Sequence, residues 1–343
     1  MPNIQDPKKF AHDLTGWFRL NKRDLPFRMD KDPYRIFVSE LMLQQTQIDT
    51  MIPYYERFMA RFPNVKALAD ANLDEVMALW AGLGYYRRAR FLHESARMIR
   101  DDFGGVFPSA LKDIESLKGV GRYTARAIHS IAFGEPSPAV DGNVMRVMAR
   151  VTGYDKDIKK NSHMREIESS LKNVIVHAHP GDFTEALMEI GALVCKKRPV
   201  CEACPLSAHC FAYEHNMQDS LPVVSRRAAK HEQHFHTFVI RSSDGFLLTK
   251  RPDTGLLGGM FAFPQYEGVS YDAARDSFEK DYGIRLENPE SLGTVKHIFT
   301  HRVWHMRVLY MEISITGGQA FHPESKLESL PTAHGKIVKL FGK

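Results

Sequence analysis

The fold of the first part of the chain is decided by one short stretch, Leu117-Lys118-Gly119-Val120-Gly121-Arg122-Tyr123-Thr124-Ala125. Two glycines two positions apart can close a tight turn between helices and let backbone N–H groups approach a phosphate closely. Such a contact positions nucleic-acid backbone without reading a base. A plain helix–helix turn is the alternative. The flanking Leu, Arg, Thr and Ala favour DNA contact by Gly119, Gly121 and Arg122.

Helical periodicity surrounds this turn. Short Gly- and Pro-containing breaks separate the helical segments, and no strand-like alternation of any length interrupts them. This part of the chain is therefore predicted to be all-α. Apolar residues recur at three- and four-residue steps in Pro33–Thr50, Leu73–Leu79, Arg87–Asp102, Tyr123–Phe133, Asn143–Thr152, Arg165–Val176 and Phe183–Val194.

The pattern changes after the last cysteine. Residues 216–233 are polar and basic and are predicted to be an interdomain linker. Residues 234–343 are predicted to be a small α+β domain. Within it, β-rich runs lie at His236–Arg241 and Phe246–Lys250, on either side of a turn at Ser242–Gly245, and at His305–Ile315, with a helical stretch at Tyr271–Asp281.

Length and composition bound the class of protein. The 343 residues suit two or three domains, and 43% hydrophobic with 25% charged residues indicates folded cores. No run of about 18 apolar residues predicts a membrane span, and Met1–Phe18 lacks the features of a secretory signal. The net charge of +5 is weak support for an anionic partner, so nucleic-acid binding depends on local motifs.

Glu40 is the first candidate catalytic residue. Leu41, Met42 and Leu43 surround it with apolar bulk, and a carboxyl group lodged among such residues can serve as a general acid. The alternative is a solvent-exposed Glu on an amphipathic helix. The neutral hydrogen-bonding residues that follow, Gln44, Gln45 and Thr46, suit a DNA groove or a gap in a base stack, and Gln44 is predicted to share a helix face with Glu40.

Asp141 is the second candidate. It lies in Pro138–Arg146, downstream of the glycine turn and directly before a predicted helix. An isolated Asp in this place is often a mere N-cap. Its position relative to the turn also allows its carboxylate to face positive charge that develops on a sugar.

All four cysteines lie in the spacing Cys195-x5-Cys201-x2-Cys204-x5-Cys210. Only the central pair has the C-x-x-C spacing of a zinc knuckle, and the wide outer gaps favour a cubane iron–sulfur cluster over zinc. Four thiols so close together indicate a reducing compartment. The basic residues Lys196, Lys197 and Arg198 in the first gap are either phosphate contacts or a solvated charge run.

These four elements, in this order, resemble the helix-hairpin-helix iron–sulfur DNA glycosylases, and within them the adenine DNA glycosylase (MutY) family. The resemblance extends over nearly the whole chain. It implies a six-helix barrel domain with the helix-hairpin-helix at 29–135, a helical 4Fe-4S domain from 1–28 and 136–215, and a Nudix-like lesion-recognition domain at 234–343. The segments that carry the resemblance most specifically are Pro33–Thr50, Trp80–Arg90, Leu117–Val147 and Phe183–Cys210.

The resemblance also implies a function, base-excision repair of adenine mispaired with 8-oxoguanine or guanine in duplex DNA. Glu40 is then the proton donor to adenine N7, and Asp141 stabilises the oxocarbenium-like sugar. The other implied roles are pocket neighbours for Tyr123 and Asn143, contact with the extruded adenine for Arg28, entry into the base stack for Gln45 and Tyr85, contact with 8-oxoguanine for Phe299, Thr300 and His301, and cluster ligation for Cys195, Cys201, Cys204 and Cys210.

Tyr123 stands where endonuclease III-type enzymes carry the Lys that forms a Schiff base and cuts the strand. A phenol cannot form an imine, so a monofunctional glycosylase that leaves an abasic site is predicted. The first cysteine gap is one residue shorter than the family's usual six, Phe27 replaces a usual Trp, and Thr300 replaces a usual Ser. In Asp276–Ile284, Ser277 and Lys280 break the Nudix carboxylate motif, which predicts a domain without pyrophosphatase activity.

Three other readings compete with this one. An endonuclease III-like pyrimidine glycosylase/lyase is disfavoured by Tyr123 and by the extra C-terminal domain. A DNA-binding scaffold needs neither Glu40 nor Asp141, and a Nudix hydrolase needs the broken motif. The expected partner is duplex DNA with no membrane association, and the expected state is a monomer in a bacterial cytoplasm.

Overall fold

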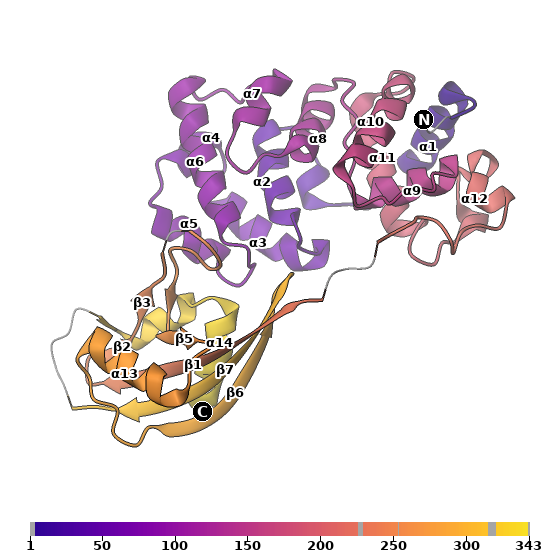
Figure 1. Ribbon diagram of the computed structural model, residues 1–343. Coiled ribbons are helices and arrows are strands. Elements are labelled where there is room, and N and C mark those ends of the chain that lie inside the picture. Colours follow the sequence, from indigo (N-terminus) through magenta and orange to yellow (C-terminus); the bar gives the residue numbers. More distant parts are fainter. Residues whose placement is uncertain (1–3, 226–228, 253, 315–319, 342–343) are drawn as a thin grey trace. The chain divides into compact units, whose positions relative to one another are not determined.

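The computed structural model describes residues 4–225, 229–252, 254–314 and 320–341. The chain divides into two compact units, Met1–Leu79 with Arg88–Arg226, and Trp80–Arg87 with Arg227–Lys343. The first unit is helical and the second contains the sheet (Figure 1). None of the helices in the described segments combines the length and the apolar character needed to cross a membrane.

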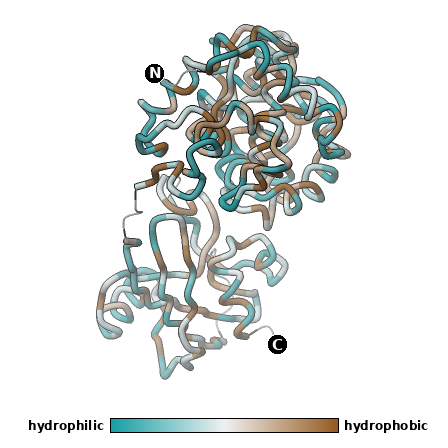
Figure 2. Tube along the Cα trace, turned by 90° about the vertical axis from the view of Figure 1, so that its right-hand side faces the viewer, coloured by the Kyte–Doolittle hydropathy of each residue, from teal (hydrophilic) through white to brown (hydrophobic). Residues whose placement is uncertain are grey.

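The described part of the helical unit contains no β-strand, in agreement with the predicted all-α body. Most helices carry one buried face, and hydrophobic and hydrophilic residues alternate along the winding chain in Figure 2. The elements are α1 Pro7–Asn21, η1 Pro26–Arg28, α2 Pro33–Leu43, α3 Ile48–Arg61, α4 Val65–Ala69, α5 Leu73–Trp80, α6 Arg87–Asp102, α7 Leu111–Ser116, α8 Arg122–Phe133, α9 Gly142–Thr152, α10 Asn161–Ile175, α11 Pro180–Leu193, η2 Cys201–Ala203, η3 Ser207–His209 and α12 Phe211–Glu214.

One predicted helix is wrong. The segment Pro33–Thr50 forms two helices, because α2 ends at Leu43 and α3 begins at Ile48. Gln45 between them adopts a left-handed backbone conformation with φ 59°, which interrupts helical hydrogen bonding. Gln44 therefore follows the helix that carries Glu40 and does not share its face.

The helix α11 is central to the unit, since it packs against α1, α8 and α9. Close approach to α8 depends on Gly181, where an added Cβ would lie 3.1 Å from the carbonyl oxygen of Ser130. Apolar side chains of α1, α9, α10 and α11 share one buried core, which joins the N-terminal helix to the segment before the cysteines. Fully buried members of this core include Phe10, Leu14, Val144, Met148, Leu171, Phe183 and Ile190.

The second unit is built on a mixed sheet with the strand order β6-β7-β1-β2-β8, to which β5 adds by pairing with β1. The pair β1–β7 is parallel, and the other pairs are antiparallel. The elements are β1 His231–Ser242, β2 Gly245–Leu247, β3 Thr249–Lys250, β4 Phe261–Ala262, β5 Gln265–Glu267, α13 Tyr271–Tyr282, β6 Glu290–Ile298, β7 Arg302–Glu312, β8 Phe321–His322, η4 Glu324–Ser329 and α14 Thr332–Phe341.

Several strand boundaries differ from the sequence prediction. Strand β1 begins at His231, inside the stretch assigned to the linker, and residues 226–228 of that stretch lie outside the described residues. The run Phe246–Lys250 divides into β2 and β3, which pair with different strands. The run His305–Ile315 corresponds to β7, and Ile315 lies outside the described residues.

Helices cover both faces of this sheet. Ala274 and Phe278 of α13 pack on Phe238 and Leu309 of the strands. Ala333 and Ile337 of α14 join the core on the opposite face. The α+β prediction for this domain is therefore confirmed.

Glu168 on α10 provides a test of how the helical unit is held together. Its carboxylate is 3% exposed and binds Arg122 at 2.7 Å and Arg126 at 3.1 Å, both on α8. Glu168→Ala leaves the largely buried Arg126 without its counter-ion, so we expect a loss of about 3 kcal/mol in the free energy of unfolding. Thermal and urea unfolding followed by far-UV circular dichroism measure this loss.

Glu56→Ala on the exposed surface of α3 is the matched control and should change unfolding by less than about 0.5 kcal/mol. Equal unfolding of the two variants would show that the α8–α10 ion pairs contribute nothing.

Candidate active site

A cleft of about 1170 Å³ opens in the helical unit. Its wall is formed by η1, the end of α2, the start of α9, and side chains of α8 and α11. Eight of the residues singled out in the sequence lie together here: Arg28, Glu40, Gln44, Gln45, Thr46, Tyr123, Asp141 and Asn143. The glycine turn and the cysteines lie elsewhere in the unit, and Tyr85 and Phe299–His301 belong to the other unit.

Glu40 is 3% exposed, which excludes the solvent-exposed alternative. The guanidinium of Arg28 donates from Nη2 to Oε1 of Glu40 and from Nη1 to Oγ of Ser39, at 3.4 Å for the latter. The same guanidinium lies 3.1 Å from Glu185 on α11. Lys31 completes the ion-pair network at 2.8 Å from Glu185. Two buried carboxylates are thus balanced by two cations.

Tyr123 lies beside both candidate carboxylates. Burial raises the pKa of its phenol well above the usual range, and the negative charges of Glu40 and Asp141 raise it further. The hydroxyl therefore stays protonated at neutral pH. Its Oη lies 3.7 Å from Sδ of Met188 on α11.

Asp141 is both an N-cap and a cleft residue. Its Oδ1 accepts a hydrogen bond from the backbone N–H of Val144 at 2.7 Å, and its Oδ2 accepts one from Nδ2 of Asn143 at 2.9 Å. Burial raises the pKa of this carboxyl, and the two hydrogen bonds act in the opposite direction. Residues at the start of α9 therefore hold both oxygens of Asp141. The same side chain also lines the cleft.

Arg146 extends this arrangement toward the cysteines. Its Nη2 donates to Oδ1 of Asn143 at 2.9 Å and to the carbonyl of Gly191 at 2.8 Å. Its Nε donates to the carbonyl of Cys195 at 2.7 Å. A continuous chain of hydrogen bonds therefore joins Asp141 to the first cysteine. Sequence reasoning missed Arg146, although its place one helical turn after Asn143 was a usable signal.

The turn Gln44–Thr46 is held by Arg88 of α6, another residue that sequence reasoning missed. Nη1 of Arg88 lies 2.9, 2.7 and 2.5 Å from the carbonyl oxygens of Leu41, Met42 and Gln44. Nη2 donates to Oγ1 of Thr46 at 3.1 Å. A buried cation at the last carbonyls of α2 satisfies groups that have no helical partner. Nothing in the local sequence around Arg88 indicates this long-range role.

The glycine turn has the conformation that its sequence predicts. Gly119 has φ 75°, and an added Cβ would lie 2.8 Å from Cδ2 of Phe91. Gly121 caps α8, and the space where its Cβ would stand is open within 4 Å. Gln44 donates to the carbonyl of Gly119 at 3.4 Å, so this turn and the cleft are in contact. Arg122 is half exposed, and its guanidinium is paired with Glu168.

The four cysteines line one small cavity with Arg150. All four are free thiols, and burial raises the pKa of Cys204 to about 12. Nη1 of Arg150 lies 3.4 Å from Sγ of Cys195 and donates to the carbonyl of Lys196 at 2.6 Å. Among the described residues, no set of three or more His, Cys, Asp or Glu is arranged around a single metal ion. A buried cation beside four thiols that line one cavity fits an anionic group that takes thiolate ligands.

In the second unit, Phe299 is fixed at the β6–β7 turn. Its ring packs edgewise on Trp304 with centroids 4.8 Å apart, and Lys230 donates to its carbonyl at 2.8 Å. Thr300 and His301 are exposed beside it. Tyr85, in the segment that groups with this unit, has its hydroxyl 3.2 Å from Oγ1 of Thr300.

Comparison with known proteins decides the family. Residues 38–173 match the HhH-GPD superfamily of base excision DNA repair proteins, and residues 236–340 match the NUDIX domain. An adenine DNA glycosylase of Mus musculus is 34% identical over 380 residues, which cover 93% of this chain and 72% of that protein. The chain belongs to the adenine DNA glycosylase family.

Two further relatives agree with this assignment. An adenine DNA glycosylase of Buchnera aphidicola subsp. Acyrthosiphon pisum (strain APS) is 31% identical over 310 residues, covering 89% of this chain and 87% of that protein. The solved structure of a thermostable thymine-DNA glycosylase matches with a TM-score of 0.56 at 29% identity, covering 61% of this chain and 97% of that chain. This adenine DNA glycosylase is a DNA-binding base-excision repair enzyme that removes adenine, with a helix-hairpin-helix core followed by a Nudix-like domain.

The contacts of Arg88 predict a binding defect in this adenine DNA glycosylase. Arg88→Lys keeps the positive charge, but an ammonium cannot span the carbonyls of α2 and the hydroxyl of Thr46 together. We expect about tenfold weaker binding, or ~1.4 kcal/mol, to a duplex that carries a mispaired adenine. Fluorescence anisotropy under non-turnover conditions measures it.

The matched control is Arg97→Lys, at an exposed position on the same helix. If the Arg88 variant binds as tightly as this control, the turn does not depend on Arg88.

Proposed function

We propose that this enzyme hydrolyses the N-glycosidic bond of adenine opposite 8-oxoguanine or guanine in duplex DNA, and that it leaves an abasic site without cutting the strand. The observation that carries the proposal is the presence of a buried carboxyl group, Glu40, and a partly buried one, Asp141, in one cleft with the phenol of Tyr123 beside both. A glycosidic bond is broken efficiently by one proton donor and one stabilising carboxylate. The chain acts as a monomer, with residues 29–135 as the barrel domain and residues 1–28 and 136–215 as the cluster domain.

The first step brings the adenine into the cleft. Extrusion from the duplex costs a few kcal/mol, which contacts made by the enzyme must offset. The neutral side chains of Gln45 and Tyr85 enter the base stack around the lesion. Arg28, at the wall of the cleft, contacts the extruded base.

The second step is departure of the base. Glu40 in its protonated form gives its proton to adenine N7, and the C1′–N9 bond breaks with its electron pair passing to the base. Arg28 stabilises the carboxylate of Glu40 that proton transfer leaves, since the structure shows these two groups as an ion pair. Water then adds to C1′ and gives up its proton to the carboxylate of Glu40, which restores the proton donor.

Asp141 acts on the sugar. Its two oxygens are held by Val144 and Asn143, so the negative charge is oriented before the positive charge develops. Such preorganised charge needs no rearrangement at the moment of reaction. Asn143 is held in turn by Arg146, which makes the orientation of Asp141 dependent on the cysteine segment.

The monofunctional outcome follows from Tyr123. A phenol that stays protonated can donate a hydrogen bond but cannot form an imine with the sugar aldehyde. The lysines that line the cleft are Lys22 and Lys31, and the latter is held in an ion pair with Glu185. The position beside both carboxylates is held by Tyr123.

Recognition of the opposite base falls to the β6–β7 turn. Phe299 is anchored by Trp304, which leaves the exposed Thr300 and His301 to hydrogen-bond with 8-oxoguanine. The threonine hydroxyl keeps the donor and acceptor capacity of the family's usual serine.

The four cysteines hold a 4Fe-4S cluster in this proposal. Four thiols that line one cavity beside the buried Arg150 support this assignment, because such a cluster is held by four Cys thiolates. A bound cluster would brace residues 195–210 and, through the carbonyl of Cys195, the side chain of Arg146.

Anaerobically purified protein is expected to absorb near ~400 nm, as thiolate-bound iron–sulfur clusters do. Cys204→Ser should lower both the absorbance and the iron content. Ser207→Ala, in the same segment, is the control and should leave both unchanged. Zinc without iron in the purified protein would contradict the cluster assignment.

A single-turnover assay tests the reaction. Duplexes with A:8-oxoguanine, A:T and thymine glycol:A are incubated with enzyme and analysed with and without hot alkali. Cutting should occur only at the adenine opposite 8-oxoguanine and only after alkali. Glu40→Gln removes the proton donor and should slow excision by about 10²–10⁴-fold.

The exposed Glu56→Gln is the matched control and should react as the unaltered protein does. Cutting at thymine glycol without alkali would instead identify an endonuclease III-type enzyme. Full activity of Glu40→Gln would remove Glu40 from the mechanism.

A further inference from the structure

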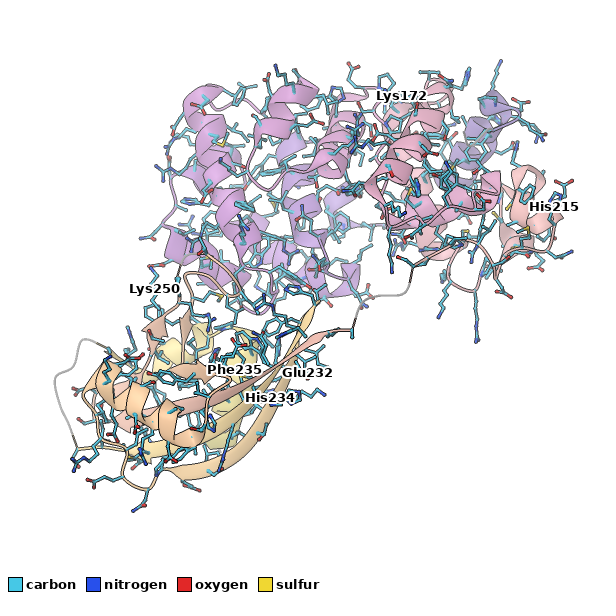
Figure 3. The ribbon with its side chains drawn as sticks, in the orientation of Figure 1. Lys172, His215, Glu232, His234, Phe235 and Lys250 are labelled. Atoms are coloured by element: carbon cyan, nitrogen blue, oxygen red, sulfur yellow. The ribbon has the colours of Figure 1, made fainter. Side chains whose placement is uncertain are left out.

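One half of the sheet in the second unit has an open polar face. Register places Lys296, His305 and His234 in one row across β6, β7 and β1, and Thr294, Arg307 and His236 in the next row. In a strand, side chains two positions apart point to the same side, so both rows lie on one face. Glu232 precedes His234 on this face, and both are labelled on β1 in Figure 3.

The same face continues into an apolar half. Phe238 and Leu309 are paired next along the strands, and α13 covers them through Phe278. Among the described residues, most of the polar half lacks such cover: Lys296, Arg307 and His234 are exposed, whereas the ring of His236 meets that of Tyr271 of α13 with centroids 6.0 Å apart. The boundary between covered and open halves coincides with the change from apolar to basic side chains.

The charged side chains of the open half are mostly basic. We name it the basic sheet face and define it as Glu232, His234, His236, Thr294, Lys296, His305 and Arg307. Glu232 is its one carboxylate, and it is engaged by Nε2 of His305 at 2.5 Å. The rings of His305 and His234 are stacked with centroids 4.8 Å apart. The two stacked imidazoles supply N–H donors, and the neighbouring Lys296 and Arg307 supply positive charge. Few acidic side chains on this face offset that charge.

Neighbouring elements do not reverse this charge. On α13, the helix that covers the apolar half, Asp272 and Asp276 pair with Arg275 of their own helix. Asp281 accepts a hydrogen bond from Tyr266 at 2.8 Å. At the opposite end of the strands, Lys230 and the exposed His301 add further basic groups beside the β6–β7 turn.

The chemistry points to phosphate. Neighbouring strands lie ~4.8 Å apart and alternate residues ~6.6 Å apart, so the face offers a lattice of donors rather than a single pocket. A flat lattice of this kind suits a repeating anion and not an isolated one. The face is continuous along β6 and β7 with the turn Phe299–His301, and the protein as a whole binds DNA.

We propose that the basic sheet face binds the phosphate backbone of duplex DNA, with Lys296 and Arg307 as the charged contacts and His234 and His305 as further donors. The contact is sequence-independent and strengthens binding to damaged and undamaged DNA alike. A merely solvated charged surface would have no such effect.

The experiment uses the full chain and a labelled, undamaged duplex, so no excision is involved and the outcome is independent of the lesion and of the catalytic residues. The dissociation constant is measured across a series of salt concentrations. For the double variant Lys296→Ala/Arg307→Ala, we expect binding at least tenfold weaker at low salt and a salt-dependence slope smaller by about 2.

The matched control removes two exposed lysines of the same unit, Lys250 and Lys339, by substitution with Ala. It should leave the slope nearly unchanged. A second variant is expected to change binding in the opposite direction, which misfolding would not do. Glu232→Gln removes the one carboxylate of the face and should tighten binding. Equal slopes for the double variant and the control, or unchanged binding by Glu232→Gln, would overturn the proposal.

Discussion

The ion pair between Glu40 and Arg28 is the interaction on which the active site depends. A carboxylate removed from water is costly unless a cation and hydrogen bonds compensate it. Arg28 provides both, and because it also binds Glu185, it joins η1, α2 and α11 at one point. The site is therefore a charged core whose parts come from three separate segments. Loss of Arg28 leaves Glu40 buried without its counter-ion, whereas Glu185 keeps Lys31.

Helix ends supply most of the remaining geometry. Asp141 caps α9, Gly121 caps α8, and the last carbonyls of α2 are bound by Arg88. Each of these ends has backbone groups without helical partners, so each can hold a side chain or a phosphate at a fixed place. The same physical feature therefore orients the carboxylate, forms the hairpin and shapes the turn at Gln45. The residues of the active site therefore lie largely at the ends of helices.

Local motifs could be predicted from the sequence, and long-range contacts could not. The glycine spacing predicted the turn at Gly119, and helical periodicity gave the bounds of α6 correctly. The break after Leu43 was missed because it depends on Arg88, which is distant in sequence. For Arg146, helical spacing could have predicted the contact with Asn143, but the contacts with the carbonyls of Gly191 and Cys195 are distant in sequence.

Phe27 packs directly beneath the active site, against Tyr55 and Arg28. Phe27 is 3% exposed, and its ring meets that of Tyr55 edgewise with centroids 6.0 Å apart. The hydroxyl of Tyr55 is buried without a hydrogen-bond partner among the described residues. Phenylalanine at position 27 offers this hydroxyl no N–H donor, and an unpaired buried hydroxyl costs about 1–3 kcal/mol. Since Arg28 stacks on the Phe27 ring at 5.1 Å, this cost falls directly beside the cation that holds Glu40. Apolar packing by Phe27 therefore supports the active site, while the hydroxyl of Tyr55 beneath it has no hydrogen-bond partner among the described residues.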